Sequence, residues 1–537
     1  MDFATVFRRR NSSLQTLSRG GFTGVLQIAG RFVYLAALLS PALLLLPFCY
    51  YSRSATFLHW YMKYLVKAIQ YSGPTFTKLG QWAGSRTDLF SLDVCRHLSQ
   101  LQSQARAHSY QWTESSILHA LGKPITEIFS HFEREPVGVG AVAQVHYARL
   151  PRVELEKNDE PEDPFFGTFF FDDSQMLIQK KAINACEQDV AVKVLHPDVV
   201  SNVYTDLKIM HSFAYAIESL VPEAHWLSLP EEVSIFGEMM VAQLDLRIEH
   251  SNLELFYLNF AGWPNVAFPL PVSSLPATYD VLVESFVDGT HMVDFLDTTT
   301  PFDKELASIG VTTFLKMLLL DNHVHADMHP GNIIIQFTKG STVYPSTMLQ
   351  QARKISLATW QDSLVRLRDD GYKPLVYFID AGLSTSLTDA SMSNFVALFK
   401  AVTHFDGNLI SQLMIERSNC PDSVINRHDF QDQMTQFIAN IKHKTLQLRS
   451  FSVNTILSFV LTKVREHHIK IDPQFINIAV GLMLVEGIGQ RLDPDMDLLT
   501  ASLPFLNLAI QRQLSLAQHH TGIKSAGSLF GKLGRTF

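Results

Sequence analysis

Cysteine is scarce in this chain, and basic residues are outnumbered by acidic ones. The four cysteines, Cys49, Cys95, Cys186 and Cys420, lie far apart and form no CxxC pair, so the sequence predicts neither a disulfide framework nor a zinc cluster. The net charge of -8 at pH 7 supplies no bulk basic surface, which argues against a nucleic-acid-binding function. With 537 residues, the chain has room for two or three domains.

The N-terminal part departs from this composition because it is almost free of acids. Residues 1–31 contain one acid, Asp2, against five arginines with serines and threonines between them, which is typical of a mitochondrial targeting segment. Residues 32–52 then carry no charge, and a helix of about 20 residues spans the hydrocarbon core of a bilayer. We predict one transmembrane helix at 32–52. A buried core helix and the apolar part of a signal peptide are the alternatives.

Strands are expected after a segment with helical periodicity at 53–131. Residues 132–150 have the pattern of a strand, a glycine turn and a second strand, and 189–197 that of a buried strand. The intervening 151–189 is acidic and contains proline, so we expect a solvated insertion there. A further strand is expected at 279–289.

We divide the remainder of the chain into 132–288 and 289–537. The second part is mostly helical and is interrupted by two short apolar strands, "NIIIQF" and "PLVYFID". The segment between these strands, 338–373, is interpreted as a second insertion. No internal repeat is apparent.

Lys193 stands in the middle of the strand at 189–197, between Val192 and Val194. Because side chains alternate along a strand, its ammonium leaves the sheet on the face opposite to the two valines. Alone, such a lysine is most simply an edge residue that reaches water. The upstream sequence "GVGAVAQV" fits G-x-G-x-x-A-x-V, a pattern whose backbone amides cover a phosphate chain. Together, the two features indicate a nucleotide site.

The stretch "HVHADMHPGNIII", 323–335, is compatible with two kinds of site. His325 and His329 are four residues apart, as in helical zinc sites. The Pro-Gly pair that follows disfavours a helix, and Ala326 stands where a zinc hydrolase needs a glutamate. These features favour the second kind of site, a phosphoryl-transfer loop.

Asp327 and Asn332 have the Asp-x4-Asn spacing of such a loop, in which the aspartate orients the acceptor and the asparagine binds Mg²⁺. Asp380 ends an apolar strand before Ala-Gly, the position of a D-F-G triplet that contacts Mg²⁺. The ordered set of glycine loop, strand lysine, Asp-x4-Asn and Asp-x-Gly favours magnesium and phosphates over zinc. We therefore expect Lys193, Asp327 and Asp380 to converge on one divalent ion, and the two histidines to be structural.

These motifs resemble those of the UbiB, or aarF-domain-containing, atypical kinase-like family, over about residues 70–500. "FTKLGQWAGSRTDLF" is similar to the family's KxGQ motif, "VAVKVLHP" to its lysine strand, "HADMHPGN" to its catalytic loop and "DAG" to its metal triplet. "MVAQLDLRIEHSNLELF" is similar to the helix that supplies the acidic partner of the lysine. The resemblance implies a two-lobed protein-kinase-like α+β fold with a KxGQ helical extension at 53–131, an N-lobe at 132–288 and a C-lobe at 289–537.

The resemblance also implies roles for single residues. Lys193 would contact the α- and β-phosphates and be held by Glu249. Glu218 is the alternative partner, because its separation from the lysine is nearer the usual interval in protein kinases. The base or acceptor-orienting residue would be Asp327, and the asparagine of the loop and the aspartate of the triplet would bind Mg²⁺. The residues expected to bind the nucleotide are Gly138, Gly140, Ala141, Val142, Ala143, Lys193, Glu284 and Phe286.

Two departures from the family pattern concern gating and the nucleotide loop. Lys78 and Gln81 belong to the KxGQ helix, which in the family crosses the nucleotide site and obstructs protein substrates. The family's acidic E-x-D feature is Gln243-Leu244-Asp245 here, so Lys78 loses an expected carboxylate, and Asp245 or water must compensate. The nucleotide loop keeps two glycines where the family is rich in alanine.

An ordinary protein Ser/Thr kinase is the least favoured function. Ala326 replaces the H-R-D arginine and no A-P-E follows the DAG triplet, so neither a phosphorylated activation loop nor a peptide platform is expected. We predict an ATPase or small-molecule kinase that uses ATP and Mg²⁺, anchored by one helix to a mitochondrial membrane, the inner one. The resemblance implies a role in coenzyme Q (ubiquinone) biosynthesis or lipid metabolism, with a membrane lipid, a coenzyme Q precursor or ubiquinone-biosynthesis enzymes as partners. The alternative is a non-catalytic, nucleotide-sensing scaffold.

Overall fold

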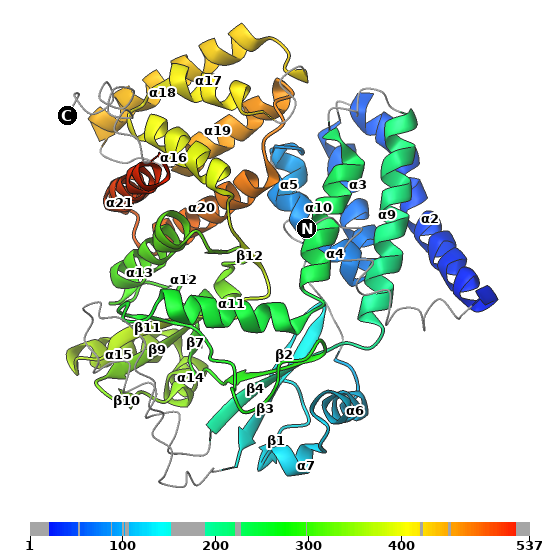
Figure 1. Cartoon of the computed structure of the whole chain (residues 1–537), viewed down its shortest axis with the longest axis vertical. Coiled ribbons are helices and arrows are strands. Elements are labelled where there is room, and N and C mark those ends of the chain that lie inside the picture. The colour runs from blue at the N-terminus through cyan, green and yellow to red at the C-terminus, as the bar shows by residue number, and fades with distance from the viewer. Residues whose placement is uncertain are drawn as a thin grey trace. The chain divides into compact units, whose positions relative to one another are not determined.

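The computed structural model describes residues 21–51, 54–86, 88–98, 101, 107–151, 188–220, 227–296, 298–418, 423–448 and 453–521. Most of the predicted targeting segment and nearly all of the predicted insertion at 151–189 lie outside these residues. The chain divides into two compact units (Figure 1). Unit 1 comprises 1–289, 338–345 and 377–383, and unit 2 comprises 290–337, 346–376 and 384–537.

Unit 1 begins with a series of helices. They are α2 (Gly21–Tyr51), α3 (Ala55–Tyr71), α4 (Pro74–Ser85), α5 (Leu92–Leu98), α6 (Tyr110–Leu121) and α7 (Ile125–Ile128). Ser54 caps α3 by accepting a hydrogen bond from the amide of Phe57. Gly122 ends α6 with a φ of 72°, the left-handed conformation that glycine adopts without strain.

An antiparallel sheet follows these helices. Its strands are β1 (His131–Phe132), β2 (Gly138–Val139), β3 (Ala143–Leu150), β4 (Gln188–Leu195) and β6 (Val281–Ser285), in the order β1-β3-β4-β6, with β2 also paired to β3. One face of the sheet is apolar: Val190, Val192 and Val194 are fully buried and pack in one cluster with Ile117 of α6 and Ile125 of α7. Figure 1 shows α6 and α7 beside the strands. Since side chains alternate along β4, the opposite face is left for polar groups.

The rest of unit 1 carries the residues that complete this polar face. Its further elements are α9 (Val199–Leu220), α10 (Leu229–Ala242), α11 (Leu246–Asn259), β5 (Val266–Ala267) and β10 (Thr342–Val343). Phe256 of α11 is fully buried, and its ring stacks on that of Phe268 with the centroids 4.8 Å apart. This apolar contact holds α11 in the core of unit 1.

Unit 2 combines short strands with long helices. Its elements are β7 (Thr290–His291), α12 (Val293–Leu296), α13 (Asp303–Leu315), the π-helical turn η3 (Lys316–Asp321), β8 (Val324–His325), the 3-10 turn η4 (Pro330–Asn332), β9 (Ile333–Lys339), α14 (Ser346–Ile355), α15 (Leu357–Asp369), β11 (Lys373–Phe378), β12 (Ser384–Thr385), α16 (Asp389–Thr403), α17 (Gly407–Glu416), α18 (Arg427–Leu448), α19 (Val453–Glu466), α20 (Pro473–Leu492) and α21 (Leu498–Thr521). The two predicted apolar strands correspond to β9 and β11, and the segment between them contains α14 and α15. β8 pairs with β12, His325 opposite Ser384.

The helix α20 is long and apolar enough to cross a membrane, judged by length and composition within the described part of the chain. Its packing is that of a core helix. Glu486, in the second half of α20, is fully buried and accepts hydrogen bonds from the amides of Val453 and Asn454 at the start of α19. A carboxylate so placed satisfies amides that the first turn of α19 cannot satisfy itself.

Candidate nucleotide and magnesium site

Lys193 projects from β4 on the face opposite to its valine neighbours, into a group of acidic side chains. Its Nζ donates to both carboxylate oxygens of Glu249, at 2.8 and 2.7 Å. Glu249 is 3% exposed and lies in the first turn of α11, which Asp245 caps by accepting a hydrogen bond from the amide of Arg247. The N-terminal end of a helix favours a carboxylate. The start of α11 therefore positions the acid that holds the lysine.

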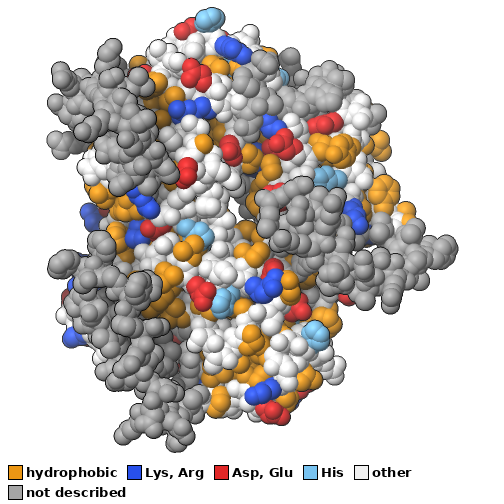
Figure 2. All heavy atoms as spheres, viewed as in Figure 1, with side chains coloured by type: hydrophobic (Ala, Val, Ile, Leu, Met, Phe, Trp, Pro, Cys, Tyr) orange, Lys and Arg blue, Asp and Glu red, His pale blue; other side chains and the backbone are white. Residues whose placement is uncertain are grey.

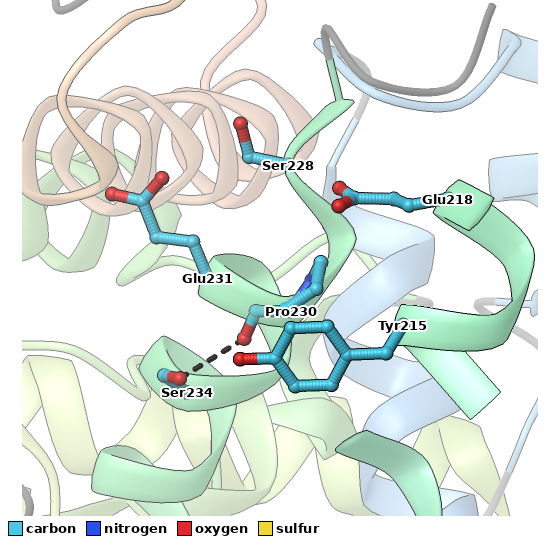
Figure 3. Close-up of a pocket in the computed structure, with 6 residues that line it drawn as sticks. All are labelled: Tyr215, Glu218, Ser228, Pro230, Glu231 and Ser234. Carbon is cyan, nitrogen blue, oxygen red and sulfur yellow. Dashed lines mark hydrogen bonds between the residues drawn. The ribbon is translucent and has the colours of Figure 1, made fainter. Parts of the chain in front are cut away.

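Glu218, the alternative partner of Lys193, lies elsewhere in unit 1. It is close to the end of α9, and one of its carboxylate oxygens is buried without a hydrogen-bond partner. With Tyr215 and residues at the start of α10, it lines an open hollow of about 500 Å³, to which Glu231 also contributes (Figure 3). Lys193 is not among the residues that line this hollow. The structure thus pairs the lysine with Glu249, the residue that the family resemblance indicates.

Asp380 is the second acid at the lysine ammonium, with its Oδ1 2.8 Å from the lysine Nζ. It follows β11 and has a φ of 60°, a left-handed conformation that costs a non-glycine residue energy and is typical of functional sites. Asn252 of α11 donates to the carbonyl of Ala381 at 2.8 Å and fixes this turn. A Cβ at Gly382 would come within 3.4 Å of the α11 glutamate. The Asp-Ala-Gly triplet therefore packs directly on the acid that holds the lysine.

Glu284 brings a third carboxyl group to this face of the sheet. In the pairing of β4 with β6, Lys193 is opposite Leu282, two residues before Glu284, so the two side chains share one face. Glu284 is 9% exposed, and its Oε2 is buried without a hydrogen-bond partner. Phe286 follows the strand, and its amide donates to the carbonyl of Asp189 at 3.0 Å. Both residues that were predicted to bind the nucleotide at this strand therefore lie next to β4.

Burial and like charge determine the protonation of this group. Burial, reinforced by the Glu249 carboxylate, raises the pKa of Glu284 to about 8. Burial also raises the pKa of Glu249 to about 7, although the neighbouring ammonium opposes the shift. For Lys193, burial lowers the pKa, but the carboxylates of Asp380 and Glu249 outweigh it and raise the pKa above the ordinary value. A charged lysine is thus surrounded by more acidic groups than it neutralises.

The glycine loop joins β2 to β3. The amide of Gly140 donates to the carbonyl of Ala143 at 2.9 Å, and a Cβ at Gly140 would approach that oxygen to 3.3 Å. Gly138 and Gly140 are exposed, whereas Ala141, Val142 and Ala143 are buried. The glycines therefore form the outer edge of the loop, where a ligand can approach the backbone, and the three residues that follow anchor it.

The predicted catalytic loop lies in unit 2, after η3. Asn332 donates from Nδ2 to the backbone oxygen of Asp327 at 3.1 Å and to its Oδ2 at 3.2 Å, so the two side chains of the Asp-x4-Asn motif are in contact. The prediction that Asp327 joins Lys193 and Asp380 around one ion involves both units and stays a prediction.

The two histidines of this loop support its backbone. His325 is 1% exposed, and its Nδ1 accepts a hydrogen bond from the amide of Asp327 at 3.2 Å. His329 accepts one from the amide of Gly331 at 3.1 Å. In the part of the chain that the structure describes, no three histidine, cysteine, aspartate or glutamate side chains are grouped to hold a metal ion. The two hydrogen bonds agree with a structural role for the histidines.

Comparison with protein families agrees with the order of these motifs. The ABC1 atypical kinase-like domain matches residues 100–155 and 181–414, and the UbiB helical domain matches 434–497. The chain belongs to the ABC1/UbiB atypical kinase-like family. Its α+β fold is accordingly kinase-like, as the sequence predicts.

Similar proteins are found in yeasts and bacteria. A mitochondrial ABC1 family protein of Schizosaccharomyces pombe is 38% identical over 88% of this chain and 69% of its own. A second, from Saccharomyces cerevisiae, is 37% identical over 89% and 74%. A probable protein kinase UbiB of Xanthomonas euvesicatoria is 26% identical over 83% and 70%. A solved structure from Mycobacterium tuberculosis, described as Rv3197 with erythromycin, covers 72% of this chain and 84% of its own, with a TM-score of 0.40 and 16% identity.

The KxGQ helix of this ABC1 family chain is α4. Gln81 donates from Nε2 to the carbonyl of Leu101 at 3.0 Å. Asp245, which was expected, with water as the alternative, to compensate for the missing partner of Lys78, accepts hydrogen bonds from Nε and Nη2 of Arg247, at 3.0 and 2.9 Å. Whether Asp245 or water takes the place of the missing carboxylate beside Lys78 stays a prediction. The gating roles of Lys78 and Gln81 stay predictions.

Two residues for which the sequence predicted no role make long-range contacts in unit 1. Arg86, after α4, is 2% exposed and pairs with Asp88 at 2.8 Å and with Glu232 of α10 at 2.7 Å. His196, directly after β4, contacts the carbonyl of Gly140 with its Nε2 at 3.0 Å and so supports the glycine loop. The His-Pro pair after the lysine strand was a usable signal for His196. Arg86 gave none, because an arginine is expected at the surface.

Proposed function

We propose that this chain is an atypical kinase-like ATPase or small-molecule kinase that uses Mg²⁺ and ATP at the mitochondrial inner membrane and supports ubiquinone biosynthesis or lipid metabolism. The main support is the ion-paired group of Lys193, Glu249 and Asp380, whose residue types and chain order are those of a phosphoryl-transfer site. The mitochondrial relatives support the location. The family resemblance supports the link to ubiquinone and lipids, and the apolar helix α2 is the candidate for attachment to the membrane.

The residues around Lys193 suit a nucleotide that carries a divalent ion. Glu249 and Asp380 both pair with the single ammonium of Lys193, so this group holds one acid more than the ammonium neutralises and has capacity for a further cation. Carboxylate and amide oxygens are the ligands that Mg²⁺ prefers, and Asp380 and Asn332 would provide them. Mg²⁺-ATP, when bound, supplies the phosphoryl group.

The chain's own residues would position the reaction. Glu249 holds the ammonium of Lys193 in one place, so this ammonium would need little reorganisation to contact the α- and β-phosphates of a bound nucleotide. The exposed glycine edge of the loop lets the backbone approach the phosphates closely. Asp327, whose carboxylate contacts Asn332, would orient the acceptor hydroxyl or water and take its proton.

ATP hydrolysis by the purified full chain, in detergent with anionic lipid, tests the proposal. The variants are Asp327→Asn and Asp380→Asn, and the matched control is Asp362→Asn, an exposed aspartate of α15. We expect turnover that depends on Mg²⁺, a loss of about 100-fold or more in both site variants, and wild-type turnover in the control.

The alternative function is decided by the same experiment combined with a binding measurement. If wild-type protein binds nucleotide but releases phosphate no faster than the Asp327→Asn and Asp380→Asn variants, the chain is a nucleotide-sensing scaffold and the enzyme proposal fails. If transfer to a serine or threonine of an added peptide accompanies hydrolysis, the protein-kinase function that the sequence disfavours is restored.

A further inference from the structure

The helix α2 has two different faces. Its outward face carries Val33, Ala37, Leu44 and Phe48, which are spaced by four, seven and four positions and therefore form one stripe along the helix. All four are exposed, with Val33 at 65%, Leu44 at 72% and Phe48 at 65%. Figure 2 shows hydrophobic side chains at the surface on the side where α2, α3 and α9 lie in Figure 1. An exposed apolar helix face of this kind marks an interaction surface.

The inward face of α2 is built into unit 1. Arg31 donates from Nε and Nη2 to the carboxylate of Asp206 on α9, both at 2.9 Å, and Asp206 is 1% exposed. Four and eleven residues further along, Leu35 and Ala42 are buried. The start of α2 is therefore fixed to the body of unit 1 by a charge-assisted contact with two hydrogen bonds.

The helix α3 packs beside α2, and two hydrogen bonds fix which residues of the two helices are neighbours. Tyr61 donates to the carbonyl of Ala42, and Tyr64 to that of Leu38, both at 3.1 Å. Lys63, between these two tyrosines, is exposed. It therefore lies level with the middle of 32–52. If 32–52 crossed a bilayer, this ammonium would lie well inside the hydrocarbon, where a charged side chain is costly.

The exposed face of α3 has the composition of a membrane–water interface. Trp60, Lys63, Lys67 and Tyr71 follow at intervals of three, four and four residues and share one face. Trp60 is 54% and Tyr71 70% exposed, and both lysines are exposed. Tryptophan and tyrosine prefer the headgroup level of a bilayer, and lysine suits anionic headgroups.

We propose that α2 and α3 form a surface that docks in the plane of a membrane. The outer stripe of α2 lies among the acyl chains of one leaflet, and the exposed face of α3 lies at its headgroups. The occupant of this surface is a bilayer with anionic lipid, because the neighbouring helix α3 exposes two lysines beside Trp60 and Tyr71, and because the arginine-rich 1–31 precedes the apolar stripe in the sequence. The inference rests on the proposed membrane location, and it replaces a single crossing by attachment to one side.

Flotation of the full chain with vesicles tests the surface. The vesicles contain phosphatidylcholine, with or without phosphatidylglycerol. Ala37→Asp combined with Leu44→Asp should reduce flotation about tenfold or more. Lys63→Gln combined with Lys67→Gln should remove the gain that phosphatidylglycerol gives. Leu258→Asp, an equally apolar and 68% exposed position on α11, is the matched control and should float like the wild type.

Protection from protease separates docking from crossing. Protein with an epitope tag before α2 is added to the outside of preformed vesicles. The proposal requires that the tag stays open to protease, and a protected tag would show a transmembrane helix and overturn it. The proposal is also overturned if the variant with Ala37→Asp and Leu44→Asp floats as well as the wild type. It is likewise overturned if the wild type does not float and elutes as a dimer. ATP hydrolysis in detergent should be unchanged in this variant, so failure of the docking surface and failure of the enzyme proposal are distinguishable.

Discussion

Replacing Glu284 with glutamine should remove a pH-dependent loss of stability. Glu284 is 9% exposed, its Oε2 has no hydrogen-bond partner, and Glu249 is its main source of like charge. Burial of an ionised carboxylate without a partner is unfavourable, so the folded protein prefers the neutral acid. Glutamine keeps the shape of the side chain and removes its titration.

The sign and size of this pH effect on stability follow from the pKa values of Glu284 in the folded and unfolded chain. The pKa of Glu284 is 4.5 in an unfolded chain and about 8 in the fold. The stabilising contribution of the neutral acid is fully present below about pH 4.5 and is lost as the pH rises through about 8, at about 1.4 kcal/mol for each pH unit. The full linkage would be about 5 kcal/mol. Relaxation of the surroundings reduces this, and we expect about 2–3 kcal/mol between pH 5 and 8.

Urea unfolding of the full chain at several pH values, followed by tryptophan fluorescence, measures this effect. The unfolding midpoint of the wild type should fall from about pH 5 to about pH 8 more steeply than that of Glu284→Gln. Glu238→Gln, at an exposed position of α10, should follow the wild type. Parallel curves for wild type and Glu284→Gln would refute the reasoning, because Glu284 would then be ionised in the fold at no cost.

Two further predictions concern Arg86 and His196. Arg86→Leu leaves Asp88 and Glu232 buried without their cation and should lower the free energy of unfolding by about 3–5 kcal/mol, as measured by urea unfolding. Adding Glu232→Leu to this variant should restore part of the lost stability. An unchanged unfolding midpoint in Arg86→Leu would contradict the buried ion network. His196→Ala removes the contact with the Gly140 carbonyl and should weaken nucleotide binding about fivefold, from the loss of about 1 kcal/mol. Titration with a fluorescent nucleotide measures the Kd of this variant. If both the Kd and the unfolding midpoint are unchanged, the glycine loop keeps its conformation without His196.

The local sequence pattern was sufficient to predict the strands and turns that carry the residues of the site. Alternation along β4 predicted that Lys193 leaves the sheet opposite to Val192 and Val194, and the structure buries both valines fully. The glycine pattern predicted the turn between β2 and β3. The order of the motifs along the chain indicated the kinase-like family. Each of these inferences uses residues within a few positions of one another, and backbone geometry relates such residues directly.

Tertiary structure decided which side chains meet. Glu218 and Glu249 were both possible partners of Lys193 from sequence, and the packing of α11 selected Glu249, 56 residues from the lysine. Tertiary packing likewise decided that Arg86 is buried and that Lys63 of α3 lies beside the middle of 32–52. The sequence alone determined which residues are helical, extended or charged, because those properties are local. Contacts between distant segments depend on the helices and strands around them, and the folded chain alone reveals these contacts.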